Sequence, residues 1–332
     1  IDLMQAESVA NLVSASSHRG VNIALNGLRG KLSKEIASMR DEMIDVLSYS
    51  EHLLDVSEED LTTANISYII SKTAKMHEMA QKLIENYSTC RIMTYGAVVV
   101  LCGPVNSGKS TLFNSLVGSN RAIVNREPGT TRDLLEAMII IDGVPITLVD
   151  TAGLREASND IEIEGVRRAK DYIKKADLVF VVNDITLGKT SMESIDNNLF
   201  KDNHYVNIYN KTDLLSQKDI KKCRSVFKPG LFTSALTGVG LGELKNHIIT
   251  ALDLESNTGE NFGITTTRQY NAILKSDAAM AAVIEIAEQY PLQLELVSFE
   301  LQNALNSIED LLGTKTADEV LNNMFDNFCV GK

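Results

Sequence analysis

The sequence is poor in cysteine and has no long apolar run. None of its four cysteines is paired at a metal or redox spacing such as C-x-x-C, which predicts reduced thiols in a cytosol-like compartment. The longest apolar run, 97–102, is far shorter than the ~20 residues of a membrane-spanning helix. The chain begins at Ile1 without a signal peptide, and the lack of an initial Met predicts a fragment of a longer protein.

Positive charge is also scarce. Lys and Arg number 32 against 44 Asp and Glu, which gives a formal net charge of −12. So acidic a chain is not expected to be a general nucleic-acid binder, because phosphate binding depends on clustered positive charge. Contact with RNA would require a local basic patch or a partner protein. The hydrophobic fraction of 44% and the charged fraction of 23% exclude a disordered or collagen-like chain.

Hydrophobic periodicity divides the 332 residues into three blocks. Apolar residues within 21–46 recur at steps of three or four, which predicts one long helix. A second helical stripe lies within 66–87, and helical stripes return within 270–328. Between them, residues 96–253 alternate helical patterns with strand-like runs. These runs lie at 96–102, 137–142, 146–150, 177–182, 205–210 and 230–234.

This alternation predicts an α/β unit with a mostly parallel sheet and helices on both of its faces. The helical stripes on either side are buried most simply in one bundle built from both flanks. We therefore predict that 1–94 and 256–332 are the two parts of a helical domain, and that 95–255 is an α/β domain inserted between them. The chain length agrees with about two domains.

Residues 103–110, Gly-Pro-Val-Asn-Ser-Gly-Lys-Ser, match the phosphate-loop pattern G-x-x-x-x-G-K-[ST]. The motif follows a predicted strand and opens a predicted helix, which disfavours a simple glycine-rich turn. Backbone N–H groups would surround the phosphates, Lys109 would reach the outer phosphates, and the hydroxyl of Ser110 would ligate Mg²⁺. The predicted nucleotide-binding residues of this loop are Asn106, Ser107, Gly108, Lys109, Ser110 and Thr111.

Two further motifs follow in the order expected of small GTPases. Residues 210–213, Asn-Lys-Thr-Asp, end one predicted strand, and residues 234–235, Ser-Ala, end the next. The Asp213 carboxylate can accept from both N1–H and the amino group of guanine, a donor pair that adenine lacks. Lys211 would pack over the base. The predicted base-binding residues are Asn210, Lys211, Asp213, Ser234 and Ala235, and they favour GTP over ATP.

A D-x-x-G motif closes another predicted strand. Its Asp150 is the predicted Mg²⁺ carboxylate, and the N–H of Gly153 is the predicted donor to the γ-phosphate. Residues 129–133 lie where a switch loop belongs, and Thr131, with Thr130 as the second choice, would complete the Mg²⁺ shell. Four elements in this order predict a Ras-like P-loop G domain. Its predicted magnesium ligands are Ser110, Thr131 and Asp150.

The residue that positions the attacking water is not evident from these motifs. Segment 154–165 contains no Gln of the kind that Ras-type enzymes use. Four acidic residues are open candidates, and each is more often part of a solvated face. They are Glu156, Asp160, Glu162 and Glu164. Positive charge beside the phosphates could come from Arg132, from Arg155, or from a monovalent cation that Asn106 ligates through its carbonyl oxygen.

At this point the sequence resembles one family, the MnmE (TrmE) family of tRNA modification GTPases, over nearly its whole length. The likeness is carried by IDLMQAE at 1–7, GTTRD at 129–133, DTAGLREA at 150–157 and CVGK at 329–332. The last of these is the most discriminating, since other GTPases of this branch lack it.

The resemblance implies a homodimer whose G domains approach each other in a potassium-dependent way. Asn106 matches the family's potassium-ligating asparagine, and the backbone around Asn125 and Glu127 matches its cation-binding loop. Glu162 matches the glutamate that orients the hydrolytic water. Cys329 matches a terminal cysteine near the modification site, with a small apolar residue at a helix end as the alternative. The implied catalytic residues are Glu162, Thr131, Lys109 and Cys329, and the implied cofactors are GTP, Mg²⁺ and K⁺.

The resemblance also implies a flavoprotein partner, MnmG (GidA). With it, the family installs an aminomethyl or carboxymethylaminomethyl group on C5 of the wobble uridine of certain tRNAs. The one-carbon unit comes from a folate, bound by an N-terminal domain that this chain lacks, so full folate binding is not expected. The expected location is a bacterial cytoplasm without membrane association, with the mitochondrial matrix as the alternative.

The chain departs from the family pattern in two loops. Pro104 and Val105 shift the usual proline of the phosphate loop by one position. Pro128 stands where the cation loop usually has a small or apolar residue, which makes potassium affinity the point to test.

Two other functions are alternatives to this one. A ribosome-assembly GTPase of the Era or Der kind is disfavoured, because the sequence has no second phosphate loop and no carboxyl-terminal G-x-x-G loop. A nucleotide-sensing scaffold would turn over GTP slowly, whatever the cation.

Overall fold

The computed structural model groups the chain into two compact units. One contains residues 1–94 and 259–332, and the other contains residues 95–258. The residues that the structure describes are 2–15, 17–55, 62–119, 122–123, 135–151, 171–191, 204–227, 229–252, 254, 262–289 and 293–313.

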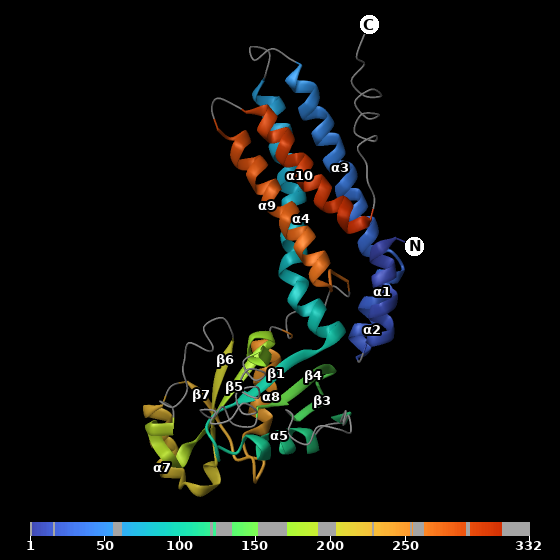
Figure 1. Cartoon of the computed structure of the whole chain (residues 1–332). Coiled ribbons are helices and arrows are strands. Elements are labelled where there is room, and N and C mark those ends of the chain that lie inside the picture. Colours follow the sequence, from blue (N-terminus) through green and yellow to red (C-terminus); the bar gives the residue numbers. More distant parts are fainter. Residues whose placement is uncertain are drawn as a thin grey trace, which may run out of the picture. The chain divides into compact units, whose positions relative to one another are not determined.

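The first unit is a bundle of helices drawn from both ends of the chain (Figure 1). Its described helices are α1 (Leu3–Ser14), α2 (His18–Leu28), α3 (Lys31–Leu54), α4 (Thr63–Tyr95), α9 (Thr267–Ala287) and α10 (Leu294–Leu312). Side-chain caps fix where two of them begin. Asp2 and Gln5 form a reciprocal capping box at α1, and Thr266 and Gln269 form another at α9.

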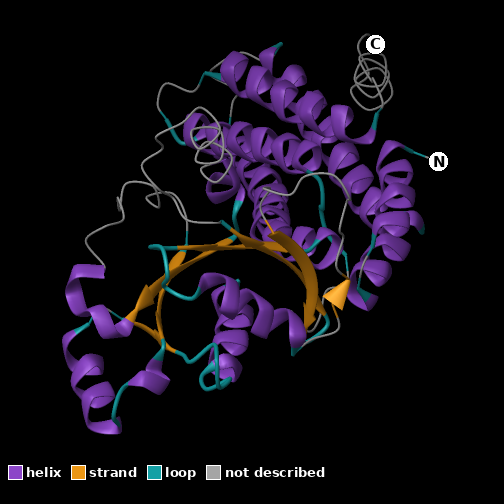
Figure 2. Ribbon diagram, turned by 60° about the horizontal axis from the view of Figure 1, so that its bottom comes forward, coloured by secondary structure: helices purple, strands orange, loops and turns teal. Residues whose placement is uncertain are grey.

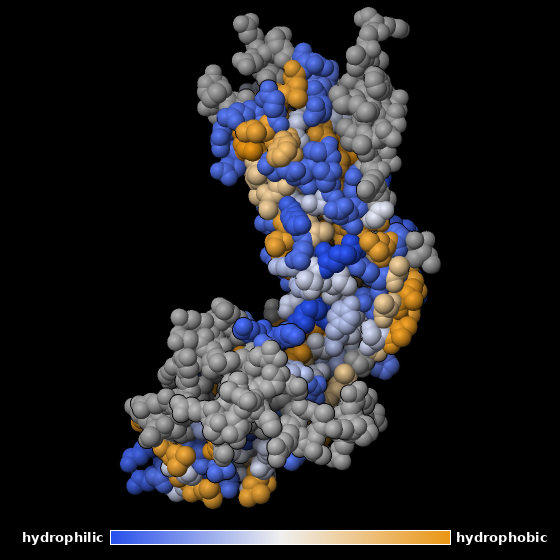
Figure 3. All heavy atoms as spheres, in the orientation of Figure 1, coloured by the Kyte–Doolittle hydropathy of each residue, from blue (hydrophilic) through white to orange (hydrophobic). Residues whose placement is uncertain are grey.

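One hydrophobic core joins the two ends of the chain. Ile36, Met39 and Met43 of α3 lie in the same buried cluster as Ile273 of α9 and Leu305 of α10. Full burial of one such side chain stabilises the folded state by roughly 1.5–3 kcal/mol. The visible outer face of the bundle is mostly hydrophilic, with scattered apolar residues (Figure 3). The prediction that both helical flanks form one bundle is therefore confirmed.

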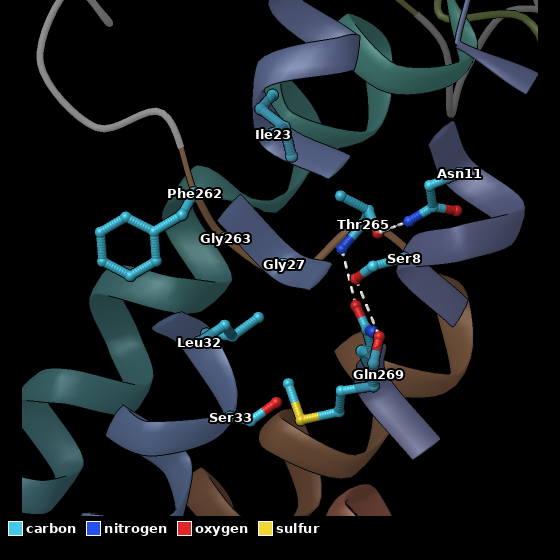
Figure 4. Close-up of a pocket in the computed structure, with 11 residues that line it drawn as sticks. Ser8, Asn11, Ile23, Gly27, Leu32, Ser33, Phe262, Gly263, Thr265 and Gln269 are labelled. Atoms are coloured by element: carbon cyan, nitrogen blue, oxygen red, sulfur yellow. Dashed lines mark hydrogen bonds between the residues drawn. The ribbon is translucent and has the colours of Figure 1, made fainter. Parts of the chain in front are cut away.

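Polar contacts tie α1 to the start of α9. Glu7 accepts two hydrogen bonds from the guanidinium of Arg268, at 2.7 and 2.8 Å. Asn11 Nδ2 donates to Thr265 Oγ1 at 2.9 Å (Figure 4). Arg268 also donates to the carbonyl oxygen of Asp310, near the end of α10, at 3.1 Å. Residues more than 250 positions apart thus hold the same corner of the bundle.

The prediction of one long helix across residues 21–46 is wrong. Helix α2 ends at Leu28 and α3 begins at Lys31, because Gly30 adopts a left-handed conformation with φ of 73°. The side chain of Gln5 donates to the carbonyl oxygen of Leu28 at 3.2 Å, which satisfies one of the carbonyl groups left free at the end of α2. The apolar spacing continues across this turn, so periodicity alone does not reveal it.

The second unit contains a seven-stranded sheet (Figure 2). The strands are β1 (Ala97–Cys102), β2 (Ala122–Ile123), β3 (Leu135–Ile141), β4 (Val144–Asp150), β5 (Leu178–Asp184), β6 (Tyr205–Asn210) and β7 (Gly230–Phe232). Their order is β2-β3-β4-β1-β5-β6-β7. Strand β1 is central and parallel to both β4 and β5, whereas β3 and β4 form an antiparallel hairpin. The two-residue strand β2 was not predicted from the sequence.

Turn chemistry and burial explain this sheet. Asp142 and Gly143, with φ of 49° and 82°, form the tight turn between β3 and β4, and positive φ at both positions suits a two-residue hairpin. All seven residues of β5 are buried, as expected for a strand covered on both faces. The helices of this unit are α5 (Lys109–Gly118), α7 (Gln217–Val226) and α8 (Leu241–Ala251), with 3-10 turns η2 (Ile185–Ser191) and η4 (Thr212–Leu214), and the described residues 171–175 are also helical.

Parallel pairing brings the carboxyl ends of five strands to one edge of the sheet. Strands β4, β1, β5, β6 and β7 are neighbours in that order and run in the same direction. Ligands of open α/β sheets bind at this edge. No helix among the described residues has the length and apolar character that crossing a membrane requires.

Replacing Gly30 with alanine is expected to destabilise the helical unit by roughly 1–2 kcal/mol, because a left-handed residue with a side chain is strained. The new Cβ would also lie 2.9 Å from Gln5 Nε2. Asparagine tolerates this conformation better, so Gly30→Asn is the matched control and should lose less. Urea unfolding followed by circular dichroism measures both. Equal losses for the two variants would contradict a conformational role for Gly30.

Candidate functional site

The loop between β1 and α5 is shaped by two glycines. Gly103 has φ of 142° and Gly108 has φ of 92°, both outside the range that L side chains readily adopt. A Cβ at Gly103 would overlap the carbonyl oxygen of Val182, and a Cβ at Gly108 would overlap the side-chain amide of Asn210. Asn106, exposed at the tip of the loop, is also left-handed, with φ of 62°. The backbone therefore curls as a phosphate loop requires.

A buried lysine and a buried aspartate lie beside this loop. Lys109 Nζ donates to the carbonyl oxygens of Gly103 at 2.9 Å and Pro104 at 2.8 Å, and the residue is only 7% exposed. Burial lowers the pKa of Lys109, while the charge of Asp150 acts in the opposite direction. Burial raises the pKa of Asp150, while a hydrogen bond with Ser110 and the charge of Lys109 act to lower it.

Two buried oxygens next to this loop have no hydrogen-bond partner among the described residues. They are Asp150 Oδ1 and Ser107 Oγ. An unpaired buried carboxylate oxygen is costly unless another group completes its interactions. Carboxylate and hydroxyl oxygens are the ligands that Mg²⁺ prefers, so Asp150 and Ser110 fit such a cation.

The side chain of Asn210, at the end of β6, joins three segments. Its Nδ2 donates to the carbonyl oxygen of Ser107 at 3.0 Å. Its Oδ1 accepts from the backbone N–H of Ala235 at 3.0 Å and from Thr233 Oγ1 at 3.4 Å. Ser115 Oγ on α5 donates to the carbonyl oxygen of Ala235 at 2.6 Å. The phosphate loop and the two predicted base-binding loops thus form one connected structure.

Neighbouring side chains orient two further predicted base-binding residues, Lys211 and Asp213. Lys211 has φ of 67°, and its Nζ lies 2.6 Å from Asp184 Oδ2. Asp184 is further held by Thr186, whose N–H and hydroxyl both donate to its Oδ1. Asp213 is exposed, and its Oδ1 accepts a hydrogen bond from the hydroxyl of Ser234. Within the part of the chain that the structure describes, the other carboxylate oxygen of Asp213 has no hydrogen bond and can accept one from a ligand.

The predicted site residues divide into two groups. The structure brings together those of the phosphate loop, Asp150, and those of the two base-binding loops. The members of this group are Asn106, Ser107, Gly108, Lys109, Ser110, Thr111, Asp150, Asn210, Lys211, Asp213, Ser234 and Ala235. The other group lies outside the described residues. Its members are Asn125, Glu127, Thr131, Gly153, Glu162 and Cys329.

Sequence analysis missed Asp184 and Ser115. Asp184 could have been found, because it ends a buried strand at the ligand-binding edge, as Asp150 does. Ser115 is one polar residue on a short helix, and nothing in the sequence pairs it with Ala235. Its role depends on how α5 packs.

A phosphate loop hydrogen-bonded to a guanine-type recognition loop is the arrangement of P-loop GTPases, and the strand order gives this unit their Ras-like fold. The chain belongs to the MnmE family: the family model described as the MnmE helical domain matches residues 3–329. It is accordingly a GTPase, as the motifs predict.

Curated relatives match the chain along its whole length. One, from Alkaliphilus metalliredigens, is 32% identical over 335 residues that span all of this chain and 72% of that protein. Another, from Koribacter versatilis, is 33% identical over 335 residues with the same two coverages. Both are described as tRNA modification GTPase MnmE. Among solved structures, Aquifex aeolicus Era bound to GDP and AlF4⁻ is similar over 56% of this chain and 67% of that one, with 26% identity and a TM-score of 0.39.

The substitution Asp184→Asn is expected to weaken GDP binding about tenfold, because Lys211 loses the charged hydrogen bond that orients it. If Asp184 acts through Lys211, the same substitution should have little effect in a Lys211→Ala background. Fluorescent GDP binding to the two single variants and the double variant measures this coupling. Additive losses, or a lowered melting temperature for Asp184→Asn alone, would indicate a general structural role instead.

The thiol of Cys102 is expected to be unreactive in the folded protein. It is fully buried at the end of β1, and burial raises its pKa to about 12. Because the thiolate is the reactive form, iodoacetamide at pH 8 should modify the partly exposed Cys223 at least about tenfold faster. Peptide mass mapping over time gives both rates. In denaturant the difference should disappear, and a fast reaction of Cys102 in the native state would contradict its burial.

Proposed function

We propose that this chain hydrolyses GTP in a potassium-stimulated reaction that serves tRNA modification. The names of its relatives state a tRNA modification GTPase and say nothing of potassium. The observation that carries the proposal is the amide of Asn210. It holds the phosphate loop at Ser107 and the base-binding loop at Ala235 in one hydrogen-bonded unit. A site with this connection can hold both ends of a guanine nucleotide.

The phosphate end would be bound by backbone N–H groups and by Lys109. The loop opens at Gly103 and closes on α5, so amides of its last residues and of the first helical turn face the anion. Mg²⁺ bound to Ser110 and Asp150 would neutralise charge that develops on the phosphates. Thr111 would contact the nucleotide from the first turn of α5. Lys109, already at the loop, would exchange its carbonyl partners for phosphate oxygens.

The base end would be selected by Asp213. Its open carboxylate oxygen and the oxygen that Ser234 holds can accept the two donors on the guanine edge. Adenine presents no such donor pair, and a carboxylate left unpaired against it disfavours ATP. Lys211, fixed by Asp184, would lay its aliphatic stem over the ring.

Catalysis would use residues on both sides of the phosphates. Glu162 would orient the attacking water, while Thr131 and the N–H of Gly153 would meet the γ-phosphate and its metal. A potassium ion held by Asn106, with the backbone around Asn125 and Glu127, would place positive charge at the bridging oxygen. Support for this cation site comes from Asn106, whose left-handed backbone holds it exposed at the loop tip.

The wider role would require partners. We propose that the chain acts as a homodimer together with an MnmG-type flavoprotein, on C5 of the wobble uridine of tRNA. Cys329 would lie near the modified base, and the folate one-carbon donor would be bound by an additional domain. A bacterial cytoplasm is the proposed location.

GTP turnover in matched KCl and NaCl at equal ionic strength tests the proposal. We expect turnover at least about tenfold faster in KCl, since a correctly sized cation adds fixed positive charge at the transition state. Asn106→Ala and Glu162→Ala should each abolish the stimulation. Their matched controls, Asn246→Ala and Glu243→Ala, alter exposed residues of α8 that are not among the predicted nucleotide-binding residues, and should retain it.

Equal and slow rates in both salts would overturn the potassium site. The departure at Pro128 would then account for the missing potassium response, and a nucleotide-sensing scaffold would describe the chain better. If Asn106→Ala lowers turnover equally in KCl and in NaCl, so that the ratio of the two rates is unchanged, Asn106 serves nucleotide binding alone.

A further inference from the structure

The charge of this chain is unevenly distributed. The whole sequence carries a net charge of −12, yet residues 8–34 contain no Asp or Glu. The same segment holds four Lys and Arg residues and one histidine. It forms most of α1, all of α2 and the first turn of α3.

Helix α2 packs through one face of small and apolar residues. Its buried residues are Gly20, Ile23 and Ala24. A Cβ at Gly20 would lie 2.6 Å from the carbonyl oxygen of Met93, so α2 approaches the end of α4 closely. Ile23 and Gly27 line a small pocket together with residues of α1, α3 and the segment before α9 (Figure 4). This face of α2 is therefore occupied.

The opposite face of α2 carries the positive charge. Helical spacing places His18, Asn22 and Arg29 on that face, with Arg19 at its margin, and all four are exposed. The first turn of α3 continues with Lys31 and Lys34, also exposed. We call the surface formed by these residues the α2 basic face. From Arg19 to Arg29 it extends roughly 15 Å along the helix.

Ion pairs among the described residues do not explain these charges. Within the part of the chain that the structure describes, no ion pair involves the guanidinium groups of Arg19 and Arg29 or the ammonium of Lys34. Lys31 lies over the ring of Phe262 at 4.1 Å. Arg29 caps the carboxyl end of α2, where a cation is favourable to the helix dipole, but Arg19 and Lys34 lie in the first turns of α2 and α3, where a cation is unfavourable. Neither ion pairing nor the helix dipole accounts for Arg19 and Lys34.

We propose that the α2 basic face binds the phosphate backbone of tRNA. This inference rests on the proposed function, which makes tRNA the substrate. Clustered Arg and Lys side chains without acidic neighbours provide the local attraction that an acidic protein otherwise lacks. The amide of Asn22 lies between the arginines and can donate to or accept from ribose and base edges.

The composition of this face favours RNA over an anionic membrane. Helices that lie on membranes insert large apolar side chains beside their basic residues. None of the exposed large apolar side chains of the described residues lies on α2 or in the first turn of α3, and those in segment 8–34, Val9 and Val13, lie on α1 outside the α2 basic face. A polar and basic surface without such anchors suits a hydrated, charged polymer.

Binding of a tRNA transcript to the full chain, measured by fluorescence anisotropy at several salt concentrations, tests the proposal. Arg19→Gln combined with Arg29→Gln should weaken binding about 10- to 50-fold at 0.1 M salt, and should lower the slope of log K against log salt by about 1 to 2. Arg19→Lys combined with Arg29→Lys keeps the charge and should bind nearly as the parent does.

The matched control removes two charges elsewhere. Lys221→Gln combined with Lys222→Gln alters the exposed helix α7 by the same net charge and should leave tRNA binding unchanged. GTP turnover and melting temperature should stay the same in all of these variants, since none of the residues belongs to the nucleotide site.

Several outcomes would overturn the assignment. Equal losses of tRNA affinity in the α2 and α7 variants would show that only net charge matters. Unchanged tRNA affinity in the α2 variant would place the tRNA site elsewhere and leave the proposed function intact. Sedimentation with phosphatidylserine vesicles that depends on Arg19 and Arg29, while tRNA binding does not, would assign the face to a membrane. If the parent chain turns over GTP but binds no tRNA even at 50 mM salt, the tRNA role itself fails for this chain, and this inference fails with it.

Discussion

The side-chain amide of Asn210 is the contact on which the nucleotide site depends. A phosphate loop that follows β1 and base-binding loops that follow β6 and β7 must keep a fixed separation to bind one ligand. Asn210 provides it by donating to Ser107 and accepting from Ala235, both at 3.0 Å. A buried amide that uses both ends cannot be replaced by an apolar group without leaving two backbone groups unpaired. Gly108 is required for the same reason, since any Cβ there would displace this amide.

Burying the charges of Lys109 and Asp150 beside that contact has a desolvation cost, and binding of a charged ligand would offset it. Lys109 and Asp150 are almost completely buried, and burial shifts the pKa of each toward its neutral form. Their mutual attraction opposes these shifts only in part, and Asp150 Oδ1 has no partner among the described residues. Such a site is preorganised, because its charges are already held in place when a polyanion and a cation bind. The ion pair between Lys211 and Asp184 likewise holds Lys211 in place before the base binds.

The helical unit carries local positive charge, through which an otherwise acidic protein can bind RNA. At physiological salt, interactions between exposed charges more than about 8–10 Å apart are largely screened, so a bound polyanion responds mainly to the charges close to it. Small residues on one side of α2 allow close packing, and Arg19 of α2 and its cap residue Arg29 are left exposed. Sequence analysis had excluded general nucleic-acid binding from net charge alone, while leaving room for a local basic patch. The α2 basic face is such a patch.

The sequence by itself determined the chemistry of the site and the class of fold. The phosphate loop, Asp150 and the Asn-Lys-x-Asp motif each lie at the carboxyl end of a strand, as the sequence predicts, because nucleotide chemistry demands particular residues at fixed spacing next to strands and helices. Periodicity also predicted the shared bundle, since apolar stripes on both flanks must be buried. Tertiary structure alone decided the turn at Gly30, where apolar spacing continues through a change in direction. It also decided the partnerships of Asp184 with Lys211 and of Ser115 with Ala235, because contacts between residues distant in sequence depend on how separate elements pack.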